Sequence, residues 1–201
     1  MNRTVVMILG AVVVLVLIIL GFVGYGISVN NKIVTADEGV KAGWSQVENQ
    51  YQRRFDLIPN LVETVKGFAK QEKEVLEGVT LARSRVGQLT VTPEVLNDPK
   101  AFAKFQQAQD GLSSALSRLL VVTENYPTLR SNENFLALQS ELEGTENRIS
   151  VERRRFNETV QSYNTLIRRF PASFIASMGG FTEKSYFSAA SGADQAPKVK
   201  F

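Results

Sequence analysis

Few side chains in this 201-residue chain could carry out chemistry. The chain contains no histidine and no cysteine, which removes the commonest general base, the thiol nucleophile and the usual ligands of transition metals. Carboxylate pairs such as Glu72 with Glu74 lie in charge patterns typical of solvated helix faces. No glycine-rich loop has the spacing that cradles phosphates or dinucleotides. The sequence therefore predicts a protein that is not an enzyme and that uses neither a metal nor a cofactor.

The remaining candidate residues are charged side chains within an apolar seam. From Ile33 to Leu89, apolar residues recur in heptads that are typical of helices packed against one another, which predicts one long rod. Asp37, Arg54 and Glu72 interrupt this seam. Arg54 and Glu72 would be about 27 Å apart on one continuous helix, so they cannot pair with each other. Each needs a partner on another helix or must extend to water, and a buried charge of this kind can fix register or partner choice.

Pro59 lies just over one turn beyond Arg54, in the same apolar stretch of residues 53–67. Proline removes a backbone donor and clashes with the preceding helical turn, at a cost of about 3 kcal/mol, so the sequence predicts a kink in the first helix. Two interpretations stay open. Pro59 is either a bend that fits the rod to its bundle or a joint at which Arg54 selects a partner.

Two further long helices must supply the partners of these charges. The second is expected to begin at Pro99, with Asp98 as its N-cap, and the third near Ser131. Glu152 lies in the middle of the third seam. Because the first and third helices of an up-down-up bundle run parallel, we expect Glu152 to pair with Arg54. The third seam recurs at every seventh residue: Phe135, Leu142, Ile149, Phe156, Tyr163 and Phe170.

The predicted fold class is all-α, with residues 30–181 forming an elongated antiparallel bundle of three long helices and a short C-terminal helix. That short helix should follow Pro171 and end at Gly179-Gly180, with Phe174, Ile175, Met178 and Phe181 as its apolar residues. Residues 182–201 are rich in serine, alanine and glycine, which predicts a mobile C-terminal tail.

The N-terminus predicts a membrane anchor. After a short flank of residues 1–4, residues 5–29 carry no charge and would form a helix of about 37 Å, enough to cross a hydrocarbon core of about 30 Å. The alternative is a cleaved secretory signal, whose apolar region is usually shorter, at about 7 to 15 residues. Arg3 on one side nearly balances Lys32 and Lys41 on the other, but a short basic start before a long apolar run favours a body outside the cytoplasm. The net charge of +3 is too small to indicate that the protein binds nucleic acid.

Several strings resemble the bacterial LemA family: RRFDLIPNLVETVKG at residues 53–67, ENYPTLRS at 124–131, LEGTENRIS at 142–150 and FNETVQSYN at 156–164. The resemblance covers nearly the whole chain. It implies a single-pass protein of the bacterial cytoplasmic membrane with a long antiparallel helical body and no established enzymatic activity. Relatives in that family include a magnetosome protein linked to membrane formation, and members are often encoded near membrane-bound metalloproteases. Where many relatives carry a histidine, this chain has Lys70-Gln71-Glu72, so a role for that histidine cannot apply.

These observations support two hypotheses of function. The first is a non-enzymatic scaffold of the bacterial envelope that is anchored in the lipid bilayer, forms homo-oligomers and helps to organise the membrane. The second is an adaptor or regulator of a membrane-bound metalloprotease or another envelope protein. Its partner surface would lie near Pro59 or on the aromatic residues 174–187.

Overall fold

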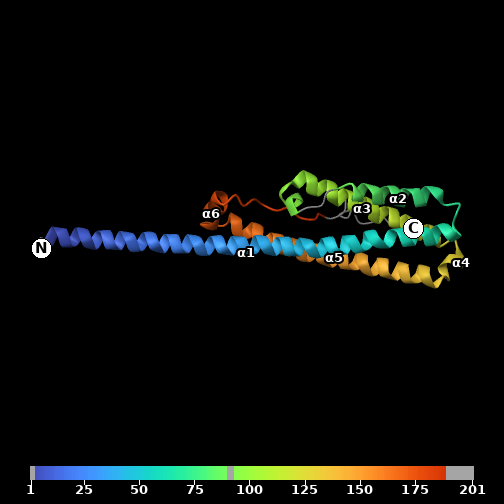
Figure 1. The fold of residues 1–201 in the computed structure, drawn as a ribbon, viewed down its shortest axis with the longest axis horizontal. Helices are drawn as coiled ribbons and strands as arrows, with labels where there is room; N and C mark the ends of the chain where they lie inside the picture. The colour runs from blue at the N-terminus through green and yellow to red at the C-terminus, as the bar shows by residue number, and fades with distance from the viewer. Residues whose placement is uncertain (1–2, 90–92, 189–201) are drawn as a thin grey trace, which may run out of the picture.

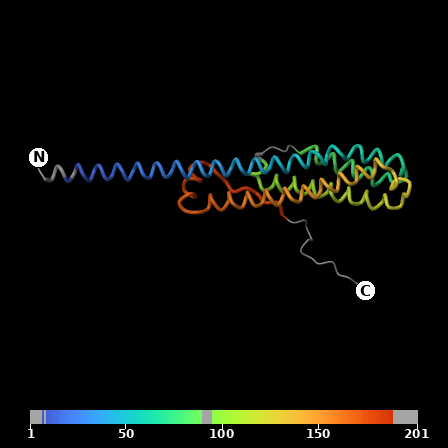
Figure 2. Tube along the Cα trace, turned by 90° about the horizontal axis from the view of Figure 1, so that it is seen from below, coloured from blue at the N-terminus to red at the C-terminus, as the bar shows by residue number. Residues whose placement is uncertain are grey.

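The computed structural model describes residues 3–89 and 93–188, and these residues contain helices without any strand (Figure 1). The body is elongated, and one end of α1 projects far beyond it (Figures 1 and 2). The elements in chain order are α1 (Arg3–Phe68), α2 (Lys73–Gly87), the 3-10 helix η1 (Pro93–Asn97), α3 (Pro99–Thr123), α4 (Pro127–Arg130), α5 (Glu133–Arg168) and α6 (Ala172–Met178).

The projecting half of α1 is the apolar segment in which the sequence analysis placed the anchor. Its large apolar side chains from Leu9 to Ile27 are exposed, and α1 is the one helix among the described residues that is long and apolar enough to cross a membrane. Val29 is the first residue of α1 that is buried against the body. The helix therefore passes from the exposed apolar segment into the body without a break.

The body contains four long helical segments rather than the three expected. The predicted first rod to Leu89 is interrupted, because α1 ends at Phe68 and the chain turns back into α2 at Lys73. The heptad pattern nevertheless marks the core on both sides of the break. Val65 on α1 and Val79 on α2 are both fully buried.

α1 and α5 form the longest contact in the body, and they run antiparallel rather than parallel (Figure 1). Gly43 of α1 lies against Phe156 of α5, whereas Arg53, further along α1, pairs with Glu141, which is earlier on α5. The expectation of an up-down-up bundle was wrong in this respect, because the turn at residues 69–72 adds one reversal of the chain.

Two apolar clusters fill the body. The cluster nearer the anchor is centred on Trp44, whose ring contacts those of Phe105, Phe156 and Phe187 at centroid distances of 5.3, 5.7 and 6.0 Å. The second cluster, towards α4, is aliphatic apart from Phe135 and includes Leu61 and Leu119.

The helix boundaries follow the capping chemistry of the sequence. The carboxylate of Asp98 accepts hydrogen bonds from the backbone N–H groups of the first turn of α3, as predicted. Asn132 caps α5 in the same way, one residue after the expected start at Ser131. The short C-terminal helix is α6, which contains the predicted residues Phe174, Ile175 and Met178 but ends before Phe181.

Residues 181–188 follow α6 as an extended segment, which we name the C-terminal strap. The composition of residues 182–201 predicts a mobile tail, but Phe187 is buried in the aromatic cluster, so the packed chain extends further than expected. Residues 189–201 of that predicted tail lie outside the described residues.

Candidate functional site

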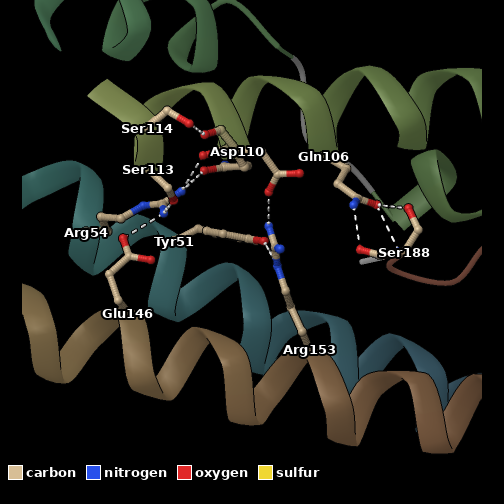
Figure 3. A network of polar contacts seen from close by, with 10 residues as sticks. Tyr51, Arg54, Gln106, Asp110, Ser113, Ser114, Glu146, Arg153 and Ser188 are labelled. Carbon is tan, nitrogen blue, oxygen red and sulfur yellow. Dashed lines mark hydrogen bonds and ion pairs between the residues drawn. The ribbon is translucent and has the colours of Figure 1, made fainter. Parts of the chain in front are cut away.

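Arg54 lies at the centre of a polar network that joins three helices (Figure 3). Its side chain is 1% exposed, and one guanidinium nitrogen donates to Ser113 Oγ on α3 at 2.7 Å and to Glu146 Oε1 on α5 at 2.8 Å. The other terminal nitrogen donates to the side-chain oxygen of Gln109. The Tyr51 ring lies 5.1 Å from the guanidinium carbon. Arg54 is therefore held by partners within its own chain.

Glu146, and not Glu152, is the carboxylate that pairs with Arg54. Glu152 pairs instead with Arg155 on its own helix, at 2.7 Å. The predicted pair assumed that the two helices run parallel, whereas their antiparallel arrangement places an earlier residue of α5 beside Arg54. Glu146 is 37% exposed and lies at the edge of the seam, so the heptad pattern gave no signal for it.

A second arginine extends the network towards the anchor. Arg153 of α5 donates to the hydroxyl oxygen of Tyr51 on α1 and to Asp110 Oδ1 on α3, the latter at 3.1 Å (Figure 3). Burial raises the pKa of the Tyr51 hydroxyl to about 12, even though the nearby charge of Arg153 acts to lower it. Tyr51 is therefore a neutral, structural hydroxyl at physiological pH.

Three amide side chains bind the backbone of the C-terminal strap. Asn164 and Asn157 of α5 each donate to a strap carbonyl and accept from the N–H of the same residue, Lys184 and Phe187 respectively, at 2.9 Å in all four bonds. Gln106 of α3 binds Ser188 in the same two-way manner, at 2.8 and 3.2 Å. The side chains thus imitate the pairing of a neighbouring strand and satisfy the backbone of an isolated extended segment.

Lys184 connects the strap to Asp37, the first polar interruption of the seam. Its ammonium nitrogen lies 2.8 Å from Asp37 Oδ1 and donates to Asn97 Oδ1 at 2.7 Å. Burial acts to raise the pKa of Asp37, but the hydrogen bonds and charges of Lys184 and Lys41 outweigh it and lower that pKa. Asp37 is therefore ionised, and its charge within the seam is balanced by partners in its own chain.

Pro59 lies within α1 on an exposed face, and the helix continues beyond it to Phe68. Because proline has no N–H, it leaves the carbonyl of Phe55 without its helical donor. Arg83 of α2 takes that place: its Nε donates to Phe55 O at 3.3 Å, and its guanidinium carbon lies 3.9 Å from the centre of the Phe55 ring. The Phe55 carbonyl, which Pro59 leaves without a helical donor, thus helps to hold α2 against α1. The kink itself stays a prediction.

Glu72 lies in the turn between α1 and α2, not inside a helix. It accepts a hydrogen bond from the Tyr126 hydroxyl at 2.9 Å, which raises the pKa of Tyr126. This contact ties the first turn of the chain to the segment between α3 and α4. Of the four predicted residues, the structure therefore places Arg54 and Pro59 about one turn apart on α1, and Glu72 and Glu152 in separate contacts.

The chemistry available to this network is hydrogen bonding and ion pairing between helices. Its arginines, amides and carboxylates contact one another or the strap, so the arrangement fixes register and holds the C-terminal strap in place.

Comparison with known proteins agrees with this description. The sequence model of the LemA family matches residues 43–201, which includes both arginines of the network and the strap. The chain belongs to the LemA family. It is a membrane-associated envelope protein of that family, with an N-terminal helix that is long and apolar enough to span a bilayer.

Two relatives are magnetosome proteins. The chain is 29% identical to magnetosome protein MamQ of Magnetospirillum gryphiswaldense over 78% of its own length and 64% of that protein. It is 29% identical to MamQ 2 of Paramagnetospirillum magneticum over 87% of its length and 70% of the relative. Protein LemA of Metamycoplasma hominis is 21% identical over 73% of this chain and 63% of that protein. The chain thus spans about two thirds of the length of these relatives.

Proposed function

We propose that this LemA-family protein is a non-enzymatic scaffold of the bacterial envelope that self-associates and helps to organise the membrane. The observation that carries the proposal is the unbroken course of α1 over 66 residues, from the exposed apolar segment into the core of the body. A continuous helix transmits the direction of the anchor to the body. The body would then extend away from the membrane along the axis of the anchor, by about 1.5 Å for each residue of α1.

The proposal places residues 5–29 in the cytoplasmic membrane as a single span, with the body on the extracytoplasmic side. The lack of histidine and cysteine supports a non-enzymatic role, because the commonest catalytic and metal-binding side chains are missing. The relationship to magnetosome proteins supports a role at a membrane.

Self-association is tested by cross-linking in membranes at native expression. Because the natural chain has no cysteine, single substitutions give clean attachment points, and Val121→Cys on α3 is suitable because Val121 is 64% exposed. Cross-linked dimers or larger species support the scaffold, whereas recovery of monomers alone refutes the oligomeric version. Labelling of the same cysteine by a membrane-impermeant maleimide in intact cells supports the extracytoplasmic orientation, and protection until lysis contradicts it.

A second candidate function is an adaptor for a membrane-bound metalloprotease or another envelope protein. A hollow of about 800 Å³ between α1 and α2, at the end of the body far from the anchor, favours it. Leu76 and Leu81 contribute an apolar lining. Its charged lining residues are three lysines and two glutamates: Lys66, Lys70, Lys73, Glu63 and Glu77. The lysines are in excess by one charge, so a partly apolar partner segment with a negative charge would fit this surface.

Affinity purification from solubilised membranes separates the two functions. A stoichiometric second protein that is lost with Lys70→Glu supports the adaptor. Recovery of the protein with itself alone, unchanged by that substitution, supports the scaffold.

A further inference from the structure

The end of the body next to the anchor exposes apolar side chains that its own fold does not use. Phe174 is 66% exposed and Met178 75%, and the interval of four residues places both on one side of α6. Phe170, in the turn between α5 and α6, is 88% exposed. The opposite side of α6 is buried through Ala172 and Ala176. We refer to residues 168–178 as the basal tip.

The position of the basal tip is fixed by α1. α6 packs against α1, and its buried alanines belong to the same cluster as Val29 and Ile33. Val29 is the last residue of the predicted anchor, residues 5–29, so the tip lies beside the point where the anchor enters the body. Figures 1 and 2 show α6 at the end of the body that faces the projecting part of α1.

The length of the predicted anchor sets the depth of this point. Residues 5–29 would extend about 37 Å as a helix, whereas the hydrocarbon core is about 30 Å thick. The last turn of the predicted anchor therefore lies in the interfacial layer of the bilayer, and the residues level with Val29 lie there with it.

Charge around the tip also fits a lipid surface. Arg168 and Arg169 at the end of α5 are exposed, and Lys32 is exposed on α1 one turn beyond Val29. Glu183 lies 3.6 Å from Arg168, which leaves the cluster basic. Basic side chains beside apolar ones are the composition of segments that lie in the headgroup layer and contact anionic lipids.

We propose that the basal tip is a second membrane-binding site, in which Phe170, Phe174 and Met178 enter the interfacial layer of the bilayer that residues 5–29 cross. The occupant is the lipid surface itself, because the tip lies beside the point where the anchor enters the body and its exposed basic residues complement anionic headgroups. Two attachments fix the body against tilting about the end of its single span. The inference rests on the proposed placement of residues 5–29 in the bilayer, but not on self-association.

The test measures the depth of the tip with a fluorescent label. The full chain carries a single Phe174→Cys substitution, labelled with an environment-sensitive nitrobenzoxadiazole dye, in vesicles of phosphatidylethanolamine and phosphatidylglycerol at low protein density. Lipids with a nitroxide near the headgroup end of the acyl chain serve as quenchers. We expect a blue shift and strong quenching, because an interfacial segment buries its apolar face about 5–10 Å into the headgroup–acyl boundary. Met178→Cys provides a second reporter on the same side.

Two controls define every outcome. Leu17→Cys, in the middle of the anchor and 62% exposed, must be quenched by a deep nitroxide, while Val121→Cys on the body must show neither shift nor quenching. If Leu17 is quenched and Phe174 behaves as Val121 does, the basal tip is refuted and the anchor stands. If Val121 is quenched as strongly as Phe174, the body lies flat on the bilayer and the tip is refuted as a distinct site. Failure at Leu17 refutes both the anchor placement and the tip.

Discussion

Removing the Phe187 side chain should release the C-terminal strap while leaving the helices in place. The Phe187 ring is 7% exposed and stacks on Trp44 with an interplanar angle of 17°. A buried phenylalanine changed to alanine costs about 3–5 kcal/mol when the site cannot collapse. In the Phe187→Ala variant the strap can instead detach from α3 and α5. The loss of stability is then limited to the free energy with which the strap binds to the body.

The change is measured at the backbone N–H of Lys184, which donates to Asn164 Oδ1 at 2.9 Å. If docking loses about 3 kcal/mol, hydrogen exchange at this amide accelerates by about 100-fold, at about 1.4 kcal/mol for each tenfold change. Hydrogen exchange of the full-length Phe187→Ala protein in detergent, followed by mass spectrometry, gives this rate. The emission of Trp44, the single tryptophan of the chain, should shift to longer wavelength as its stacked partner is lost.

The matched control is Tyr186→Ala, next in the chain but 45% exposed. It removes an aromatic ring from the same strap without opening the cluster around Trp44, so exchange at Lys184 should stay close to that of the natural protein. Equal exchange rates in the two variants would refute the conclusion that Phe187 anchors the strap.

Three further predictions concern residues of the polar contacts. Arg54→Ala should lower the free energy of unfolding by about 3 kcal/mol, the low end for a broken buried ion pair, whereas Arg53→Ala, which removes an exposed pair, should change it by about 1 kcal/mol or less; thermal unfolding followed by circular dichroism compares them. Arg83→Met should cost about 1 kcal/mol in the natural chain and less in a Pro59→Ala background, because alanine supplies the helical N–H that the Phe55 carbonyl lacks; an equal cost in both backgrounds contradicts this role of Arg83. The pKa of Asp37 is lowered in the folded chain, so its contribution to strap docking is present above the ordinary carboxyl pKa and is lost as the pH falls through the lowered one. The protection of the Lys184 N–H, which is its exchange rate relative to the intrinsic rate at the same pH, should therefore fall in acid, and Asp37→Asn should remove that loss of protection.

The sequence was sufficient for features that depend on local chemistry. Asp98 before Pro99 has the side chain and backbone that start a helix, and the structure begins α3 there. The heptads identified buried residues such as Trp44 and Tyr163 because burial follows the helical period. The turn after Phe68 gave no such signal, since residues 69–72 contain neither glycine nor proline and the heptad register continues through Val79.

Contacts between distant segments could not be predicted, because they depend on which helices adjoin and in which direction. Glu146 is a partly exposed residue in a chain rich in such glutamates, and only the antiparallel register places it beside Arg54. The strap was not predicted, because serine, alanine and glycine dominate the residues that follow it. Two features of the sequence could have indicated it: the large apolar residue Phe187, and Asn157 and Asn164 on α5, whose side chains can bind an extended backbone.

The polar network lies where the two apolar clusters meet, and this position gives Arg54 a function in register. Tyr51 belongs to the cluster near the anchor, while Ile58, one turn beyond Arg54, belongs to the cluster near α4. A shift of α1 by one turn along α5, about 5.4 Å, would preserve many apolar contacts, because the seam residues before and after Arg54 and Glu146 are apolar on both helices. It would also move Arg54 from Glu146 towards Ile149 or Leu142, both buried and apolar, and leave its charge without a partner. We therefore expect Arg54 to favour a single register between two otherwise permissive seams.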